Sequence, residues 1–170
     1  MAGKVNSFMK KLIACFAVIL AMWMLTSMLI RPASALSQAD ASVPVLADAH
    51  PEPDVLSLIE RSCQNCHSLK TDWPLYGRIF PFSLLIQHDV QQARSHMNLS
   101  QWDRYDDSEK SRILAEIGSV VRNRIMPPRR YTLLHPDARL SPDEANRIYR
   151  WTQTERKMLN HSGAGHPASE

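Results

Sequence analysis

The sequence is poor in cysteine and shows no convincing alternation of apolar and polar residues. It has three cysteines in 170 residues, and Cys15 lies inside a long apolar run, so only Cys63 and Cys66 belong to the remainder of the chain. A structural zinc site requires four ligands, usually from two close pairs, and a second Cys-x-x-Cys pair is missing. The lack of strand alternation, together with several amphipathic stretches, predicts an all-α fold.

The chain also lacks an excess of charge outside its first residues. The formal net charge is +3, from twenty basic and seventeen acidic residues. Four basic residues and no acidic ones lie within positions 1–31, which leaves sixteen basic against seventeen acidic residues, about −1 in net charge. Nucleic-acid-binding domains are usually clearly basic, so no nucleic-acid partner is expected.

The first segment has the pattern of an export signal. Lys4, Lys10 and Lys11 precede an apolar run over residues 12–30 that has no charge and no proline. At about 1.5 Å per residue, this run is long enough to cross a hydrocarbon core of about 30 Å, which favours a retained anchor. Residues 33–35 have the small-x-small form of a cleavage site, so cleavage after Ala35 stays open. The lysines predict that the rest of the chain lies on the periplasmic side of the cytoplasmic membrane.

Four segments are expected: a signal anchor or signal peptide over 1–35, a flexible proline-containing linker over 36–53, a helical domain over 54–160 and a disordered tail over 161–170. The roughly 135 residues beyond the first segment are enough for one domain with a single core. Asp107 and Ser108 are candidate caps of one helix, and Ser141 with Glu144 forms a capping box for another. Helices are expected over residues 54–63, 81–98, 107–124 and 141–159.

The stretch Cys63-Gln-Asn-Cys66-His67 carries the chemistry. A zinc site lacks its second ligand pair, and a thioredoxin-type dithiol is expected beside a strand and helix, which are not seen here. A plain disulfide between Cys63 and Cys66 is permitted outside the cytoplasm, but it leaves His67 unexplained. Cys-x-x-Cys-His attaches haem c: both thiols form thioethers and the adjacent histidine is the proximal iron ligand. We therefore favour haem c, with the disulfide and a metal site as alternatives.

The sixth iron ligand has several candidates. Met126 precedes two prolines, which remove backbone donors and stiffen the loop that carries the thioether. Loop methionines are more often packing residues, and no motif surrounds this one. The other candidates are histidines: His88 and His96, which share a helix face, and His135, which is expected to bind a loop carbonyl. Three arginines near Met126 are candidate partners of haem propionates, although surface arginines are usually solvated; they are Arg124, Arg129 and Arg130.

Several blocks of the sequence, in order, resemble a family of small exported bacterial haem-binding domains. The blocks are "CQNCHSLKTDWPLYGRIFPFSLLIQHDVQQARSHMNLSQW", "MPPRRYTLLHPDARLSPDE" and a final helix with Trp151. The resemblance covers about residues 55–159 and implies a cytochrome c-like all-α domain with one haem at Cys63, Cys66 and His67. It also makes Met126 the preferred distal ligand. It further implies that the helix before the motif crosses the last helix, so that Val55, Leu58 and Ile59 would pack against Ile148 and Trp151.

The expected function is that of a membrane-tethered periplasmic one-electron carrier with His/Met-ligated iron and no catalytic residues. Its partners would be a redox protein in the periplasm or membrane and, through residues 12–30, the membrane itself. The alternatives are a haem-based sensor or small-ligand binder with an open distal site, and a peroxidase that uses His88 or His96 for acid–base chemistry. A haem-free module held by a disulfide is the remaining possibility.

Overall fold

The computed structural model describes residues 2–29 and 43–163, and within these ranges all regular structure is helical. The chain divides into two compact units, one formed by residues 1–37 and 73–88 and the other by 38–72 and 89–170. Because all regular structure in the described residues is helical, the expected all-α class is confirmed for them. The elements are α1 (Ala2–Leu29), α2 (Pro53–Ser62), α3 (Gln64–His67), η2 (Leu75–Arg78), α4 (Phe82–His96), η3 (Leu99–Arg104), α5 (Asp107–Arg122), α6 (Arg129–Leu134), η4 (Pro136–Ala138) and α7 (Pro142–Gly163), where η marks a 3₁₀ helix.

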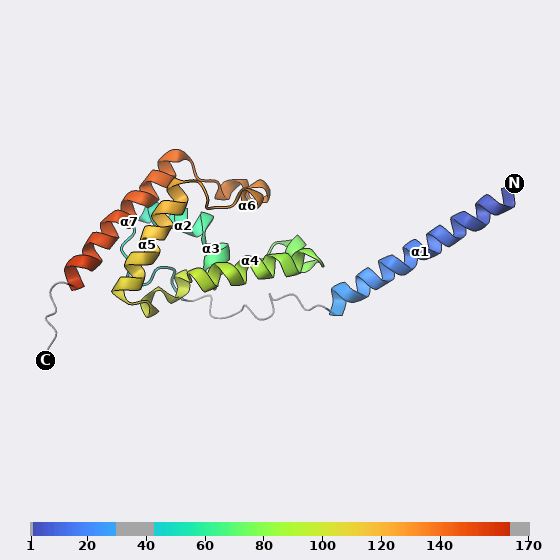
Figure 1. Cartoon of the computed structure of the whole chain (residues 1–170), viewed down its shortest axis with the longest axis horizontal. Coiled ribbons are helices and arrows are strands. Elements are labelled where there is room, and N and C mark those ends of the chain that lie inside the picture. The colour runs from blue at the N-terminus through green and yellow to red at the C-terminus, as the bar shows by residue number, and fades with distance from the viewer. Residues whose placement is uncertain (1, 30–42, 164–170) are drawn as a thin grey trace. The chain divides into compact units, whose positions relative to one another are not determined.

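The core of the second unit is built on helices α5 and α7, which lie side by side (Figure 1). Gly118 of α5 makes this approach close, because a Cβ added there would lie 2.7 Å from Oγ1 of the buried Thr152. Glycine normally weakens a helix interior by about 1 kcal/mol relative to alanine. Here the missing side chain allows two helix backbones to approach each other. The apolar side of α5 that is buried in this core comprises Ile113, Leu114, Ile117 and Val121.

Helix α2 packs on the same core, as its apolar spacing predicts. Val55, Leu58 and Ile59 are buried in one cluster with Ile148 and Trp151 of α7, so the expected crossing of the helix before the motif with the last helix is confirmed. The core position of α2 matters because the Cys-x-x-Cys-His turn begins directly after its last residue, Ser62. Burial of these side chains therefore fixes where the motif starts.

The prediction of a flexible linker over residues 36–53 is wrong for the second half of that range. Residues 43–52 belong to the folded unit, since Val45 and Leu46 are 7% and 3% exposed and the N–H of Leu46 donates to the Leu99 carbonyl at 2.9 Å. The proline and alanine composition suggested a tether, but two adjacent apolar residues in it bury against the core. Residues 36–42, the Ala33–Ala35 site and residues 164–170 lie outside the described residues.

Two helix starts show how local sequence sets the boundaries. The capping box of α7 is confirmed: the N–H of Ser141 donates to Glu144 at 2.7 Å, and the N–H of Glu144 donates to the Ser141 hydroxyl at 3.3 Å. The cap of α5 was predicted wrongly, because Asp106 and not Asp107 or Ser108 accepts from the N–H of Glu109. Helix α7 also continues to Gly163, so residues 161–163, expected in a disordered tail, are helical.

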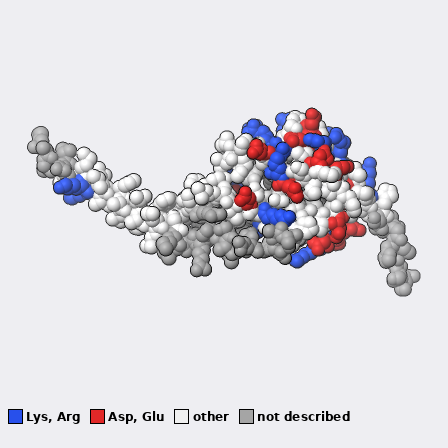
Figure 2. Space-filling model, turned by 180° about the vertical axis from the view of Figure 1, so that it is seen from behind, with Lys and Arg blue, Asp and Glu red and all other residues white. Residues whose placement is uncertain are grey.

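The first unit combines α1 with the segment from Trp73 to His88. A 21-residue stretch of α1, Ser7–Ser27, has a mean hydropathy of 2.0 and is long and apolar enough to cross a membrane. Figure 2 shows basic residues near the start of this helix and an uncharged surface beyond them, whereas the helical domain carries both charges on the face shown. The length and composition of α1 are those of a signal anchor or a signal sequence.

Candidate functional site

The Cys-x-x-Cys-His motif forms a single helical turn. Helix α2 ends at Ser62, Cys63 leaves the helical conformation with φ −124° and ψ −33°, and α3 follows directly. The N–H groups of Cys66 and His67 donate to the Cys63 carbonyl at 3.2 and 3.0 Å. Because residues three and four apart lie on the same side of a helical turn, Cys63, Cys66 and His67 are brought together on one side of this turn.

Both thiols are free and partly buried. Burial, with a smaller contribution from neighbouring Cys66, raises the pKa of Cys63 to about 12. Burial and Asp89 raise the pKa of Cys66, while Arg94 and Arg130 act in the opposite direction. A reactive dithiol would hold a sulfur anion at lowered pKa. These two cysteines are instead kept protonated at neutral pH.

His67 is oriented by the backbone that follows helix α4. Its Nδ1 lies 3.2 Å from the carbonyl oxygen of Met97. Burial lowers the pKa of His67, partly offset by the backbone carbonyls of Met97 and Ala93. A neutral imidazole that donates from Nδ1 to a carbonyl leaves the lone pair of Nε2 for a metal, which is how metal-binding histidines are usually held.

Arg94 fixes the loop that leaves the motif. Its Nε donates to the Ser68 carbonyl at 2.9 Å, and its terminal Nη2 donates to Oγ1 of Thr71 at 2.8 Å. Thr71 in turn donates to the Asn65 carbonyl at 2.8 Å. The sequence alone gives no reason to assign this role to Arg94. No local pattern marks it, since its partners lie 23 and 26 positions earlier in the chain.

Helix α6 contacts the motif through Tyr131, although the two lie far apart in the sequence. The side-chain amide of Asn65 donates to the Tyr131 hydroxyl at 3.0 Å. Arg130 forms an ion pair with Asp89 at 3.1 Å, and both of these charges influence Cys66. Helix α6 therefore borders the Cys-x-x-Cys-His turn through Tyr131, and Arg130 lies close enough to influence Cys66.

Met126 lies just after a tight helix end. Arg124 has φ +57°, and the N–H groups of Arg124 and Ile125 donate to the carbonyls of Val121 and Val120 at 3.0 and 2.9 Å. This is a Schellman motif with arginine in the left-handed position that glycine usually fills. It turns the chain sharply before Met126. The Met126 side chain is 36% exposed, and neighbouring Ile125 is 59% exposed.

The remaining predicted site residues lie on α4, on α6 and directly after α6. His88 and His96 lie on α4 and are both exposed. His135 stacks on Tyr131, with ring centroids 4.4 Å apart. Arg129 is exposed at the start of α6. Of the three arginines near Met126, only Arg130 makes an ion pair within the described residues.

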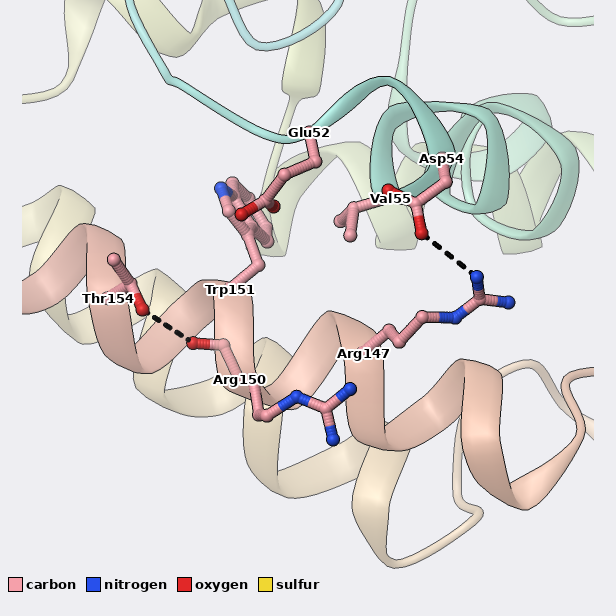
Figure 3. Close-up of a pocket in the computed structure, with 7 residues that line it drawn as sticks. All are labelled: Glu52, Asp54, Val55, Arg147, Arg150, Trp151 and Thr154. Atoms are coloured by element: carbon pink, nitrogen blue, oxygen red, sulfur yellow. Dashed lines mark hydrogen bonds and ion pairs between the residues drawn. The ribbon is translucent and has the colours of Figure 1, made fainter.

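A shallow pocket elsewhere on the domain does not match this chemistry. It lies between α2 and α7, with a volume of about 370 Å³, and an Asp54–Arg147 ion pair of 2.9 Å closes one side (Figure 3). Its lining contains no cysteine or histidine. The described residues also contain no group of three or more His, Cys, Asp or Glu suited to a metal ion. The two thiols and the imidazole on the Cys-x-x-Cys-His turn are therefore the candidate site, and this pattern of residues suits haem.

Fold and site together define an all-α protein with a one-turn Cys-x-x-Cys-His centre. The chain belongs to the haem-binding domain family, whose model matches residues 22–154, and it accordingly binds haem. It is similar to the cytochrome c peroxidase Ccp of Escherichia coli strain K12, with 28% identity over 102 residues. That match covers 58% of this chain and 22% of the relative, so the chain spans about a fifth of the relative's length. No solved structure matches the chain.

Proposed function

We propose that this chain is a membrane-tethered protein that holds one haem c covalently and carries single electrons on the periplasmic side of the cytoplasmic membrane. The observation that supports it best is the geometry of His67, whose Nδ1 faces the Met97 carbonyl 3.2 Å away and whose Nε2 is left for iron. The two thiols on the same turn complete the requirements for haem c attachment.

The thiols of Cys63 and Cys66 suit the attachment reaction. Each S–H would add across one vinyl group, so that sulfur would bond to one vinyl carbon and hydrogen to the other, with no net oxidation. The spacing of three residues presents both sulfurs from one helical turn. Asn65, between them, hydrogen-bonds to Tyr131 and Thr71. These contacts hold in place the turn that carries both thiols.

Met126 is the proposed distal ligand. It precedes Pro127 and Pro128, and α6 then begins at Arg129 and reaches the motif through Tyr131. When bound, haem supplies a one-electron iron couple, and thioether ligation raises its potential. The chain needs no acid–base group for this activity. Its partner would be a periplasmic or membrane redox protein, and α1 would keep the carrier at the membrane.

An absorption spectrum and a haem stain test the proposal. The full chain is produced in a host with haem c maturation machinery, denatured and stained, and its oxidised and reduced spectra are recorded. We expect a stain that survives denaturation and low-spin reduced bands. The matched control is Cys63→Ser with Cys66→Ser, which should lose the stain. An unstained wild-type band would remove covalent attachment and the electron-carrier role that depends on it.

A second candidate is a small-ligand or peroxide-binding haem protein with a weakly held distal position. Two observations favour it: the 36% exposure of Met126 and the similarity to cytochrome c peroxidase Ccp. His88 and His96, both exposed on α4, would be its candidate acid–base groups. Rapid carbon monoxide binding and a high-spin spectrum in the wild type would favour this candidate over the carrier. Peroxide turnover no faster than that of free haem would eliminate its enzymatic form.

A further inference from the structure

The segment from Trp73 to Leu85 has an unusual surface for a water-exposed loop. Five of its large apolar side chains are exposed, and Leu75 is the most exposed at 79%. The stretch has a single charged residue, Arg78, and four aromatic residues. An exposed apolar group of this kind indicates an interaction surface. Its members are Leu75, Ile79, Phe82, Leu84 and Leu85.

The same segment is attached to the apolar helix α1. The indole Nε1 of Trp23 donates to the Phe80 carbonyl at 3.1 Å, and both residues fall in one compact unit. Trp23 lies four positions before the end of the candidate span Ser7–Ser27. Tryptophan at that depth is typical of the membrane–water interface. The contact therefore puts Phe80 and its neighbours at the level where the span leaves the hydrocarbon.

Several backbone N–H groups of the segment donate within the segment itself, which lowers the cost of an apolar environment. The N–H groups of Gly77 and Ile79 donate to the carbonyls of Pro74 and Tyr76 at 2.9 and 3.2 Å. The turn also packs tightly, because a Cβ on Gly77 would lie 3.3 Å from Cδ1 of Ile86. The N–H groups of the following helical turn donate within the segment too: Ser83 to Ile79, and Leu84 and Leu85 to Pro81.

From these contacts we infer that residues 73–85 insert their exposed apolar side chains into the outer leaflet of the membrane that α1 crosses. Leu75 and Phe82 enter the boundary between headgroups and acyl chains, with aromatic rings at the level of the headgroups. Insertion gives the chain a second membrane contact besides α1. It also limits the rotation of the start of α4 relative to the bilayer. The inference rests on α1 being a retained anchor, which is part of the proposed function.

Spin labels on the full haem-loaded chain test this insertion. In a Cys15→Ser background, single cysteines at Leu75, Phe82 or Leu85 are labelled, and the chain is reconstituted in vesicles of phosphatidylethanolamine and phosphatidylglycerol. Oxygen reaches labels in lipid, whereas a nickel chelate reaches labels in water. We expect all three positions to be at least several-fold more accessible to oxygen relative to the chelate than a label at Leu133. Leu133 is a matched control, because it is 77% exposed but lies on α6.

A label at Leu20, in the middle of α1, distinguishes a missing anchor from a missing insertion of residues 73–85. A water-accessible Leu20 label would show that the anchor itself is absent. A lipid-immersed Leu20 label with water-accessible labels at Leu75, Phe82 and Leu85 would overturn the insertion alone. Immersion of Leu133 as well would overturn a local insertion in favour of a domain lying flat on the membrane. Label uptake by the chain without an added cysteine would reveal free thiols at Cys63 and Cys66, which is a failure of haem attachment.

Discussion

The side-chain amide of Asn65 donates to the hydroxyl of Tyr131 at 3.0 Å, joining two residues 66 positions apart. Asn65 lies between the two cysteines of the motif, and Tyr131 belongs to the helix that begins directly after Pro128. The bond therefore connects the Cys-x-x-Cys-His turn with the helix that follows Met126 and its two prolines. In the proposed site, this turn and Met126 supply ligands to opposite faces of the iron, so the connection bears on how firmly Met126 is held.

Tyr131→Phe is expected to loosen this connection with little change of shape. A neutral hydrogen bond contributes about 0.5–1.5 kcal/mol, and the free energy of unfolding of the haem protein should fall by about that amount. Carbon monoxide should also bind faster, because the Met126 segment moves away more readily. Denaturant unfolding and flash photolysis measure the two effects. Ser141→Ala, which removes the α7 cap, is the control: it should lower stability by about 1 kcal/mol without changing carbon monoxide binding.

Arg94→Lys is expected to release the loop after His67. Lysine keeps the positive charge but cannot donate to Ser68 and Thr71 with the planar geometry of guanidinium. Hydrogen bonds to charged groups contribute about 1.5–3 kcal/mol, so unfolding should become easier by roughly that range. Arg129→Lys is the matched control, since Arg129 is exposed and should tolerate the change within about 0.5 kcal/mol. Equal effects of the two substitutions on denaturant midpoints would contradict the role of Arg94.

Local signals allowed much of the helical structure to be predicted from the sequence. Ser141 and Glu144 lie three residues apart in a capping box, and the bonds they make depend on little else. Val55, Leu58 and Ile59 repeat at helical spacing, and their burial follows from it. The Cys63-to-His67 motif was likewise identified from five consecutive residues. Such features need no knowledge of distant partners.

The remaining features depend on contacts between distant parts of the chain. The carbonyl that orients His67 belongs to Met97, 30 positions away, and every residue type has such a carbonyl. Arg94 and Tyr131 likewise bind the motif loop from 23 to 66 positions away. Val45 was assigned to a linker because its neighbours are typical of linkers, although it packs in the core. Composition describes a segment, whereas burial depends on what lies against it.

Glu144→Gln is expected to remove part of the acid sensitivity of the domain. Hydrogen bonds from Ser141 and from Arg61 lower the pKa of Glu144 from 4.5 to about 2. Because the pKa of Glu144 is lower in the folded state, its carboxylate stabilises the fold at pH values above the ordinary pKa of 4.5. This contribution is lost as the pH falls from about 4.5 to about 2. Glutamine can still complete a capping box but does not titrate. The stability of the variant should therefore fall less steeply across that pH interval.

Thermal unfolding of both forms at several pH values measures this difference. Arg61 pairs with Glu144 at 2.8 Å and lies in the last turn of α2, directly before Cys63. A Glu116→Gln variant is the control, because the Arg112–Glu116 pair is exposed at both ends and 3.5 Å long and should contribute little. Parallel pH curves for the wild type and Glu144→Gln would contradict the lowered pKa.

Met126→Ala is expected to remove the proposed sixth ligand. Loss of the thioether should lower the reduction potential by an amount on the order of 100 mV, within the roughly 0.8 V range over which axial ligands set haem potentials. It should also give a high-spin spectrum and rapid carbon monoxide binding, because His67 alone would then hold the iron. Met158→Ala is the control: Met158 is similarly exposed, at 42%, but lies on α7. An unchanged potential and spectrum in Met126→Ala would leave haem attachment intact but move the sixth ligand elsewhere, with His96 on the nearby helix as the first residue to replace.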